Sequence, residues 1–533
     1  MIYVHIPFCK SFCTYCGFYS VIPDMSCDDG LDGERDSETA QCTEGSSLAA
    51  VINSRTVSSK SWTGCDNRAA AGSSRAAGSN NWIGDNNWVD GSSCATGSNN
   101  LTYSSGNVNE IRQYQKFTDA VCRELRLRRE EIVATKPCNT LYLGGGTPSV
   151  LPLDCISQIA SSAREICGED FIEFTMEMNP DDIVRGGVKW AAELREIGVN
   201  RASVGIQSFD DGVLRKMNRR HDFREAVDAY HILEEAGFDN ISIDLVFGLP
   251  SWFSPFEKDL DRLHRDIETA LSISSSGKPP KHISAYQLSV EPDSVLEAMM
   301  RKDDSIVEAP QEVCAEQYEL LCRALSDAGY NHYEVSNYAL PGYEAVHNSA
   351  YWSYLPYAGF GPAAHSFCII QSSSAPSHTQ QQSLPHSNES LYSNSVSSHS
   401  SQPLDSTCPK CHQFLSGQQS PFGDVTYLRK WNVADVNEWE RGLSELKSPN
   451  IPSGGDGISA EVLTPEQVAE EHIMLALRTS HGIPYKSLEE YGDATAMEKA
   501  LKEGLLSETP DGNIRIPEKY FFISDSIISS LFK

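Results

Sequence analysis

The chain has 533 residues, of which 40% are hydrophobic, and its 43 Lys and Arg against 73 Asp and Glu give a net charge of −30 at pH 7. This hydrophobic share is enough for a sizeable core and excludes wholesale disorder, while the acidic balance argues against nucleic acid or an anionic membrane as the main partner. No apolar run approaches the roughly 18 residues that a membrane span needs, and the N-terminus lacks the basic stretch of a secretory signal, so we expect a cytoplasmic protein that contacts membranes only through a partner.

The first predicted element is a strand over residues 2–6, followed at once by three cysteines in C-x3-C-x2-C spacing, Cys9, Cys13 and Cys16. The cysteines therefore lie in the loop at the carboxyl end of this strand. Three thiolates can hold three irons of a cubane cluster and leave the fourth iron open to another ligand. Two alternatives are chance spacing and a zinc site completed by His5, although a residue within the strand cannot easily turn to the same centre.

Two segments differ in composition from the rest of the chain. Residues 24–109 are rich in Ser, Gly and Asn and contain a near duplication, and residues 369–424 are rich in Ser, Gln and His. We predict that both are disordered insertions, with a repeat module as the alternative for the first. The second holds Cys408, Cys411 and His412 in the C-x-x-C-H pattern of covalent haem attachment, but its disordered surroundings and a cytoplasmic setting argue against a haem or metal role there.

Outside the insertions, strand-like and helix-like patterns alternate up to about residue 290. The crossover helices have lengths that suit parallel strands, so about six β/α units predict a partial (β/α)6 barrel formed by residues 1–23 and 110–290. The predicted strands cover residues 2–6, 140–143, 171–178, 201–206, 241–246 and 282–288, and the predicted helices cover 114–132, 153–166, 188–197, 223–236 and 256–271.

Polar residues and glycines follow successive predicted strands. A Gly-Gly-Gly-Thr turn over residues 144–147 follows the second strand, Glu177 ends the third, Gln207 ends the fourth and Asp244 lies in the fifth. The turn lacks the Gly-Lys-Ser/Thr of a phosphate-binding loop, and alone it would indicate only a tight βα connection. Because parallel strands end on one face of a barrel, we expect these groups to meet near the cysteine loop.

The C-terminal part of the chain has a different pattern. Residues 291–368 form an extension of the barrel, and residues 425–533 are predicted to form a small α+β, winged-helix-like domain. Thr464, Pro465 and Gln467 make a capping box that opens an amphipathic helix, and a hairpin over residues 505–516 precedes a last helix. The acidic balance argues against DNA binding by this domain.

The segment from Tyr3 to Cys9, with the C-x3-C-x2-C spacing, resembles the radical S-adenosylmethionine (SAM) superfamily. In particular it resembles the branch that contains oxygen-independent coproporphyrinogen III oxidase and the haem chaperone HemW, and the resemblance covers nearly everything outside the two insertions. It implies a 4Fe–4S cluster on the three cysteines, whose open iron chelates the methionine part of SAM, and reductive cleavage of SAM to a 5′-deoxyadenosyl radical, which requires an electron donor.

The same resemblance implies which residues contact SAM. Taken singly, Glu177 and Asp244 could equally be buried structural carboxylates, and Arg219 an exposed cation at a helix end. By similarity to the family, the predicted SAM contacts are Tyr3, Tyr15, Gly145, Gly146, Thr147, Glu177, Gln207, Arg219 and Asp244.

Three features distinguish the two branches. The oxidase carries a fourth cysteine two residues after the third, where this chain has Phe18, and it carries a segment before its cysteine motif that this chain lacks. The H-N-x-x-Y-W element at residues 347–352 is similar to the HemW branch, and its His347 could bind haem iron. A structural histidine beside packed aromatics is the alternative, and His365 is a lesser candidate.

We therefore expect a HemW-like protein that binds haem as cargo and delivers it to apo-haemoproteins, with the cluster and SAM in an auxiliary role. The alternative is a coproporphyrinogen III dehydrogenase, which would decarboxylate two propionates to vinyl groups with the protein supplying positioning. A third possibility is a catalytically silent iron–sulfur scaffold. The sequence assigns no catalytic residue and leaves open whether the protein is an enzyme.

Overall fold

The computed structural model describes residues 1–23, 108–135, 139–371, 425–445 and 458–532. Nearly all of both predicted insertions, including Cys408, Cys411 and His412, lie outside the described residues. No helix in the described ranges is both long and apolar enough to cross a membrane.

A nine-stranded sheet forms the centre of the molecule, in the order β7-β8-β6-β5-β4-β3-β2-β1-β9. The six strands β1 to β6 run parallel and stand side by side in chain order, while β9 extends the sheet beyond β1 and the antiparallel pair β8 and β7 extends it beyond β6. Because β9 and β7 are different edges, the sheet is an open, partial barrel, as predicted. The bounds are β1 (Ile2–Ile6), β2 (Thr140–Gly145), β3 (Glu173–Met178), β4 (Arg201–Gln207), β5 (Asn240–Phe247), β6 (His282–Gln287), β7 (Asn331–Glu334), β8 (Asn337–Ala339) and β9 (Ala358–Phe360).

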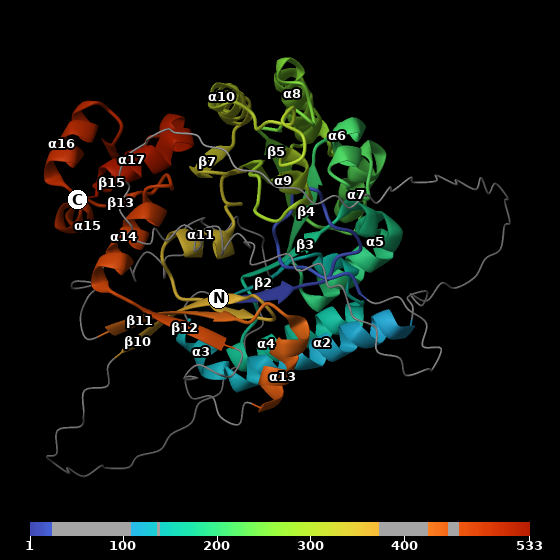
Figure 1. The fold of residues 1–533 in the computed structure, drawn as a ribbon. Helices are drawn as coiled ribbons and strands as arrows, with labels where there is room; N and C mark the ends of the chain where they lie inside the picture. The colour runs from blue at the N-terminus through green and yellow to red at the C-terminus, as the bar shows by residue number, and fades with distance from the viewer. Residues whose placement is uncertain (24–107, 136–138, 372–424, 446–457, 533) are drawn as a thin grey trace, which may run out of the picture.

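Helices between the strands cover one face of this sheet (Figure 1). Residues alternate between the two faces of a strand, and on the helix side they are apolar and buried, as Val4, Leu143, Val204 and Ile243 are. The helices are α2 (Val108–Leu127), α3 (Arg129–Ala134), α4 (Leu153–Cys167), α5 (Pro180–Ile197), α6 (Asp211–Lys216), α7 (Phe223–Glu235), α8 (Phe256–Ser272) and α10 (Gln311–Asp327), with the shorter α9 (Val295–Met300) and α11 (Val346–Trp352) in the extension.

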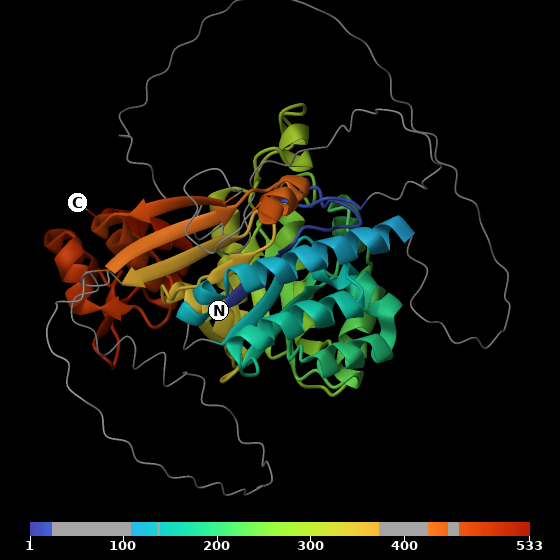
Figure 2. The same ribbon diagram turned by 90° about the horizontal axis from the view of Figure 1, so that it is seen from below.

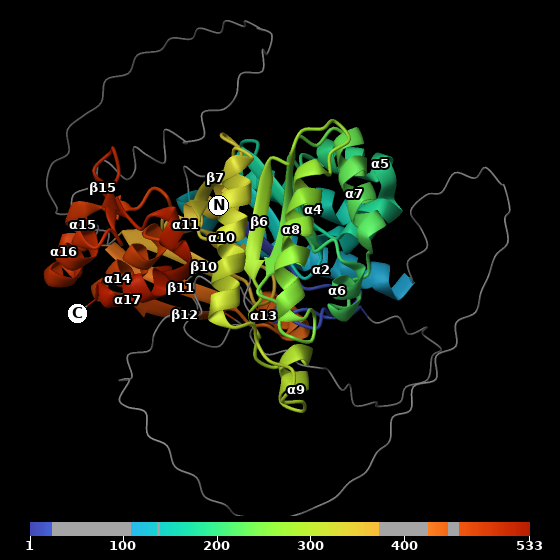
Figure 3. The ribbon, with the colours of Figure 1, turned by 90° about the horizontal axis from the view of Figure 1, so that it is seen from above.

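Two of these helices have positions that matter for the site. Figure 2 shows α2 lying along α4 on one side of the molecule, close to the edge where β1 and β9 pair. Figure 3 shows α9 projecting from the barrel on the side of the strands' carboxyl ends. The segment that carries α9 contacts the cysteine loop, because Leu296 N donates to Thr14 O at 2.8 Å.

A second, antiparallel sheet links the barrel extension to the C-terminal part. Its order is β10-β11-β12, from β10 (His365–Gln371), β11 (Val425–Asn432) and β12 (Ile458–Leu463), and α13 (Val436–Glu445) follows β11. Strand β10 lies before residue 425 and β11 begins at it, so this sheet contains strands from both sides of the boundary that the sequence suggested.

The last part of the chain consists of helices with a small β-ribbon, placed beside α10 and β7 (Figures 1 and 3). The predicted capping box opens α14: Gln467 N donates to Thr464 Oγ1 at 3.3 Å, and Thr464 N donates to Gln467 Oε1 at 2.8 Å. The elements are α14 (Pro465–Ala476), α15 (Tyr485–Tyr491), α16 (Ala494–Lys502), α17 (Ser524–Ser530) and a sheet of β13 (Ile483–Pro484), β15 (Asn513–Arg515) and β14 (Ser507–Glu508).

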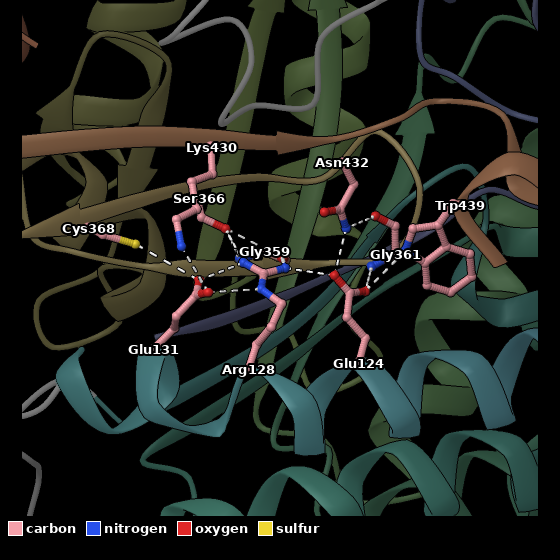
Figure 4. A network of polar contacts seen from close by, with 10 residues as sticks. All are labelled: Glu124, Arg128, Glu131, Gly359, Gly361, Ser366, Cys368, Lys430, Asn432 and Trp439. Atoms are coloured by element: carbon pink, nitrogen blue, oxygen red, sulfur yellow. Dashed lines mark hydrogen bonds and ion pairs between the residues drawn. The ribbon is translucent and has the colours of Figure 1, made fainter. Parts of the chain in front are cut away.

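A buried polar network joins the two parts (Figure 4). The Glu124 carboxylate on α2 accepts hydrogen bonds from Arg128 Nη1 at 2.7 Å, Gly361 N at 2.9 Å, Asn432 Nδ2 at 2.8 Å and Trp439 Nε1 at 3.2 Å. These donors come from the turn between α2 and α3, the loop after β9, the end of β11 and α13. One side chain thus ties the second sheet and α13 to the barrel.

Candidate functional site

A cavity of about 720 Å³ lies at the carboxyl ends of the parallel strands. The cysteine loop after β1 borders one end, and the other end reaches α11 and the C-terminal helix α14. The inner faces of β1 to β6 form its walls, and they carry polar side chains such as Tyr142, Glu177, Ser203 and Asp244. Such a concave site with few, convergent polar groups is typical of a ligand-binding cavity.

The cysteine loop is fixed to the barrel by backbone and side-chain contacts. Cys9 N donates to Val21 O at 3.0 Å, Thr14 N donates to Met217 O at 3.2 Å, and Asn218 Nδ2 donates to Phe12 O at 2.7 Å. The loop is therefore held between its own end and the turn after α6.

All three cysteines line the cavity, and two of them contact residues from other loops, one after β2 and one after α6. Arg219 Nη1 donates to Cys13 Sγ at 3.4 Å, and Cys9 Sγ lies 3.4 Å from Thr147 Oγ1. Burial raises the pKa of the Cys9 and Cys16 thiols, whereas a bound metal centre deprotonates its thiol ligands.

The donor set fits a multi-iron cluster. Among the described residues no three His, Cys, Asp or Glu side chains converge as ligands of a single ion would. A cubane makes a different demand, because each thiolate binds its own iron and the three sulfurs stay apart. Three free thiols on one anchored loop, all facing one cavity, meet that demand.

The glycine turn after β2 lies tight against β1 and the cysteine loop. Gly146 N donates to Ile6 O at 2.7 Å, and a Cβ atom at Gly146 would lie 2.8 Å from Phe8 O. Gly145 has a φ of 109°, and a Cβ atom there would lie 2.6 Å from His5 Nδ1. Only glycine allows this close approach, which brings Thr147 to Cys9.

The two predicted carboxylates lie on neighbouring walls of the cavity. Glu177 accepts from Tyr142 OH at 2.8 Å and from Gly145 N at 3.1 Å, and Asp244 accepts from Ser203 Oγ at 3.4 Å. Burial is the largest cause of their pKa shifts, and it raises the pKa of Glu177 to about 7 and that of Asp244 to about 6.

Arg219 connects the cysteine loop with two strand ends. Besides Cys13, its guanidinium donates to Gly205 O at 2.5 Å and to Asn179 Oδ1 at 2.7 Å. Gln207, at the end of β4, has a φ of 73° and lies where the register between β4 and β5 shifts. Such a left-handed conformation is strained for a residue other than glycine, and strain of this kind gathers at ligand-binding positions.

The structure brings every residue of the predicted set into this one cavity, and their binding roles stay predictions. Tyr3 and Tyr15 line it as well, and Tyr3 OH lies 3.3 Å from His5 Nδ1. The set is Tyr3, Cys9, Cys13, Tyr15, Cys16, Gly145, Gly146, Thr147, Glu177, Gln207, Arg219, Asp244 and His347.

His347 lies at the end of the cavity remote from the cysteine loop, with both ring nitrogens engaged. Nδ1 lies 2.7 Å from Thr140 Oγ1 and Nε2 lies 2.9 Å from Tyr351 OH. Burial lowers the pKa of the imidazole well below its ordinary value, so the ring is neutral. Binding to haem iron would require the Tyr351 hydroxyl to release Nε2. His365 does not line the cavity and stacks on Trp431, with ring centroids 6.1 Å apart.

The sequence analysis did not single out four further residues that line the cavity: Tyr142, Asn179, Arg201 and Tyr286. Alternation along the strand could have found one of them. Tyr142 stands between the buried, apolar Leu141 and Leu143, so its polar side chain faces the other side of the strand, toward the cavity.

Comparison with known proteins gives a match to one family model and a similarity of fold. Residues 97–263 match the family model described as the radical SAM superfamily, a range that starts after the cysteine loop. The fold is similar to that of coproporphyrinogen III oxidase (HemN) from Escherichia coli, described as a radical SAM enzyme, with a TM-score of 0.56 and 16% identity over 99% of this chain and 89% of that one. The chain is thus similar to the radical SAM superfamily over residues 97–263, which are less than half of its length.

The chain is also similar in sequence to proteins named haem chaperone HemW. It is 37% identical to the one from Bacillus subtilis over 230 residues (43% of this chain and 57% of that protein) and 36% identical to the one from Lactococcus lactis over 230 residues (43% and 56%). The match to the protein from Escherichia coli is 32% over 231 residues (42% and 55%). The matched region spans little more than half the length of these relatives.

Proposed function

We propose that this protein is a cytoplasmic haem chaperone that holds a 4Fe–4S cluster on Cys9, Cys13 and Cys16, binds SAM beside it, and delivers haem to apo-haemoproteins. One observation carries the proposal: a single cavity combines the cysteine loop at one end with the H-N-x-x-Y-W element at the other. Similarity to proteins named haem chaperone HemW, at 37% and 36% identity, supports it.

In this proposal one end of the cavity binds the cluster and SAM, and the other end binds haem. Cys9, Cys13 and Cys16 would hold the cluster, which would supply SAM with an electron obtained from a donor protein. Arg219 positions the Cys13 sulfur, Thr147 contacts the Cys9 sulfur, and Glu177 and Asp244 offer acceptors for the hydroxyl and amino groups of SAM. His347, Tyr351 and Trp352 present an imidazole and two aromatic rings to a tetrapyrrole.

The hydrogen bond between His347 and Tyr351 makes the haem assignment testable. If Nε2 of His347 ligates the iron, Tyr351→Phe frees this nitrogen and tightens haem binding several-fold, while His347→Ala weakens it about tenfold or more. Anaerobic titration followed by the Soret band measures both. Equal affinity of all three proteins would remove His347 from the haem site.

The alternative function is coproporphyrinogen III dehydrogenase, which the fold similarity to the Escherichia coli oxidase favours. Anaerobic incubation of the reconstituted protein with coproporphyrinogen III and SAM distinguishes the two. We expect no protoporphyrinogen, because Phe18 occupies the position of the oxidase's fourth cysteine and lines the cavity. Stoichiometric protoporphyrinogen formation would favour the dehydrogenase, and failure of both haem binding and SAM cleavage would favour an iron–sulfur scaffold.

A further inference from the structure

Arg201 is a buried cation on the inner face of the barrel. It is the first residue of β4, its register partners are Thr175 on β3 and Asn240 on β5, and it lines the cavity with only 2% of its surface exposed. Burying a charged side chain is costly unless the charge is paired and hydrogen-bonded.

The Arg201 guanidinium lacks such a partner. No hydrogen bond or ion pair joins this side chain to another described residue, and its buried Nε has no acceptor. The charge of Arg201 acts on the Glu177 and Asp244 carboxylates without a hydrogen bond or ion pair to either. Glu177 accepts from Tyr142 and Gly145, and Asp244 accepts from Ser203.

Two other buried arginines of this protein form the ion pairs that Arg201 lacks. Arg262 is also 2% exposed and forms ion pairs of 2.6 Å with both Asp259 and Asp266. Arg128, 6% exposed, forms ion pairs of 2.7 Å with Glu124 and Glu131. Wherever these cations serve the fold, carboxylates of the chain neutralise them. Arg201 instead presents its charge to a cavity.

Arg201 lies away from the cluster end. Arg219, which contacts Cys13, donates to the carbonyl of Gly205, and Arg201 precedes Gly205 by four residues, or about 13 Å along the strand. The cation acts on the buried His282 and His347 rings, and its charge also opposes the raised pKa values of Glu177 and Asp244. Arg201 therefore lies between these two carboxylates and the H-N-x-x-Y-W element.

A second donor without a partner lies in the same cavity. Trp352, the last residue of that element, is 8% exposed, and its buried Nε1 has no acceptor among the described residues. A planar guanidinium fork matches a carboxylate with two parallel hydrogen bonds, and an indole N–H adds a donor for an anion. The chemistry of this end of the cavity is that of a carboxylate-binding site with aromatic walls.

We propose that Arg201 is a carboxylate-binding residue of this cavity and that it receives a propionate of the tetrapyrrole. This inference rests on the proposed haem binding. The methionine carboxylate of SAM is the other source of the same chemistry, and the experiment separates the two.

The test compares two ligands on each protein: haem, which has two free propionates, and haem dimethyl ester, in which both are masked. We expect the wild type to bind haem at least about tenfold more tightly than the ester. We expect Arg201→Gln to bind haem and its dimethyl ester with about equal affinity, whereas its affinity for SAM is unchanged. Arg201→Lys, which keeps the charge without the fork, retains part of the preference.

The ratio of the two affinities on one protein does not depend on the fraction that is folded, so a loss of stability in Arg201→Gln does not imitate the expected result. Arg224→Gln, on the exposed side of α7 and outside the cavity, is the matched control and keeps the wild-type ratio. An unchanged ratio in Arg201→Gln overturns the inference, as does loss of SAM binding with the haem preference intact. If the wild type binds haem and its dimethyl ester equally well, the inference about Arg201 is wrong but the proposed function stands. If the wild type binds neither ligand, the proposed function is wrong as well.

Discussion

Glu177 and Asp244 are carboxyl groups that the barrel holds out of water. Each accepts hydrogen bonds, but burial outweighs them and raises the pKa of Glu177 to about 7 and that of Asp244 to about 6. Before a ligand binds, the ionised forms oppose the folded state. A ligand that donates hydrogen bonds to these groups would offset this cost, which agrees with their proposed role toward SAM.

The pH dependence of stability follows from this shift. The pKa of Glu177 in the folded protein lies above its ordinary value of 4.5. The contribution of this carboxyl group to the free energy of unfolding is therefore fully present below about pH 4.5, and it is lost as the pH rises through 7. Between pH 5 and pH 8 the free energy of unfolding falls in the wild type because Glu177 ionises. We expect this fall to be about 3 kcal/mol smaller in Glu177→Gln, which has no carboxyl group at this position. Denaturant unfolding of the cluster-free protein at both pH values measures this, and parallel losses in the two proteins would contradict it.

Individual site residues were predictable to different degrees. The cysteines, Glu177 and Asp244 stand at strand ends or in a spaced motif, which the sequence displays directly. Arg201 was missed because one charged residue at the start of an apolar strand does not reveal whether a partner exists. The left-handed backbone of Gln207 was also not visible, since it depends on the register shift between two strands.

Among the elements, the six strands β1 to β6 followed the prediction closely, whereas the short strands β7, β8 and β9 were not predicted. The structure gives β1 the predicted bounds, residues 2–6. Strand β2 runs two residues past the predicted end, through Gly144 and Gly145, because pairing with His5 and Ile6 overrides the poor strand propensity of glycine. Strands β7 to β9 have three or four residues each, too few for a periodic pattern.

The capping box of α14 supports a helix that borders the cavity through Met474. Thr464→Ala removes the acceptor for Gln467 N and is expected to cost this helix about 1 kcal/mol, whereas Thr464→Ser keeps the acceptor and the stability. Hydrogen exchange of the amides in the first turns of α14 measures the difference. Equal protection in the two variants would contradict a capping role.

On the scale of the whole molecule, Glu124 joins the C-terminal sheet to the barrel. Glu124→Gln leaves the buried Arg128 without a charged partner on that side and places amide hydrogens against three neutral donors, at a cost of about 3 kcal/mol or more. We expect faster proteolysis between the barrel and α14. Glu130→Gln on the exposed side of α3 is the control, because its partner Arg129 is a surface residue. Equal proteolysis rates of both variants would contradict the linking role.

The overall plan was predictable only as far as local patterns reach. Alternating strand and helix patterns indicated six parallel β/α units, and the structure has them. The sheet β10-β11-β12 was not predicted, because its first strand is separated from the second by more than fifty residues of sequence and the pairing is therefore non-local. The boundary suggested at residue 425 followed a change in composition, whereas the hydrogen bonds cross it.

The central claim is that the cysteine loop holds a cluster with one open iron that binds SAM. Anaerobic reconstitution, with iron and sulfide quantification and EPR of the reduced protein with and without SAM, tests it most directly. The account predicts about four irons and four sulfides per chain and a cubane signal that changes when SAM is added, lost in Cys13→Ser and kept in Cys155→Ser. A protein that binds a single zinc ion instead, or a cubane signal that SAM leaves unchanged, would contradict it.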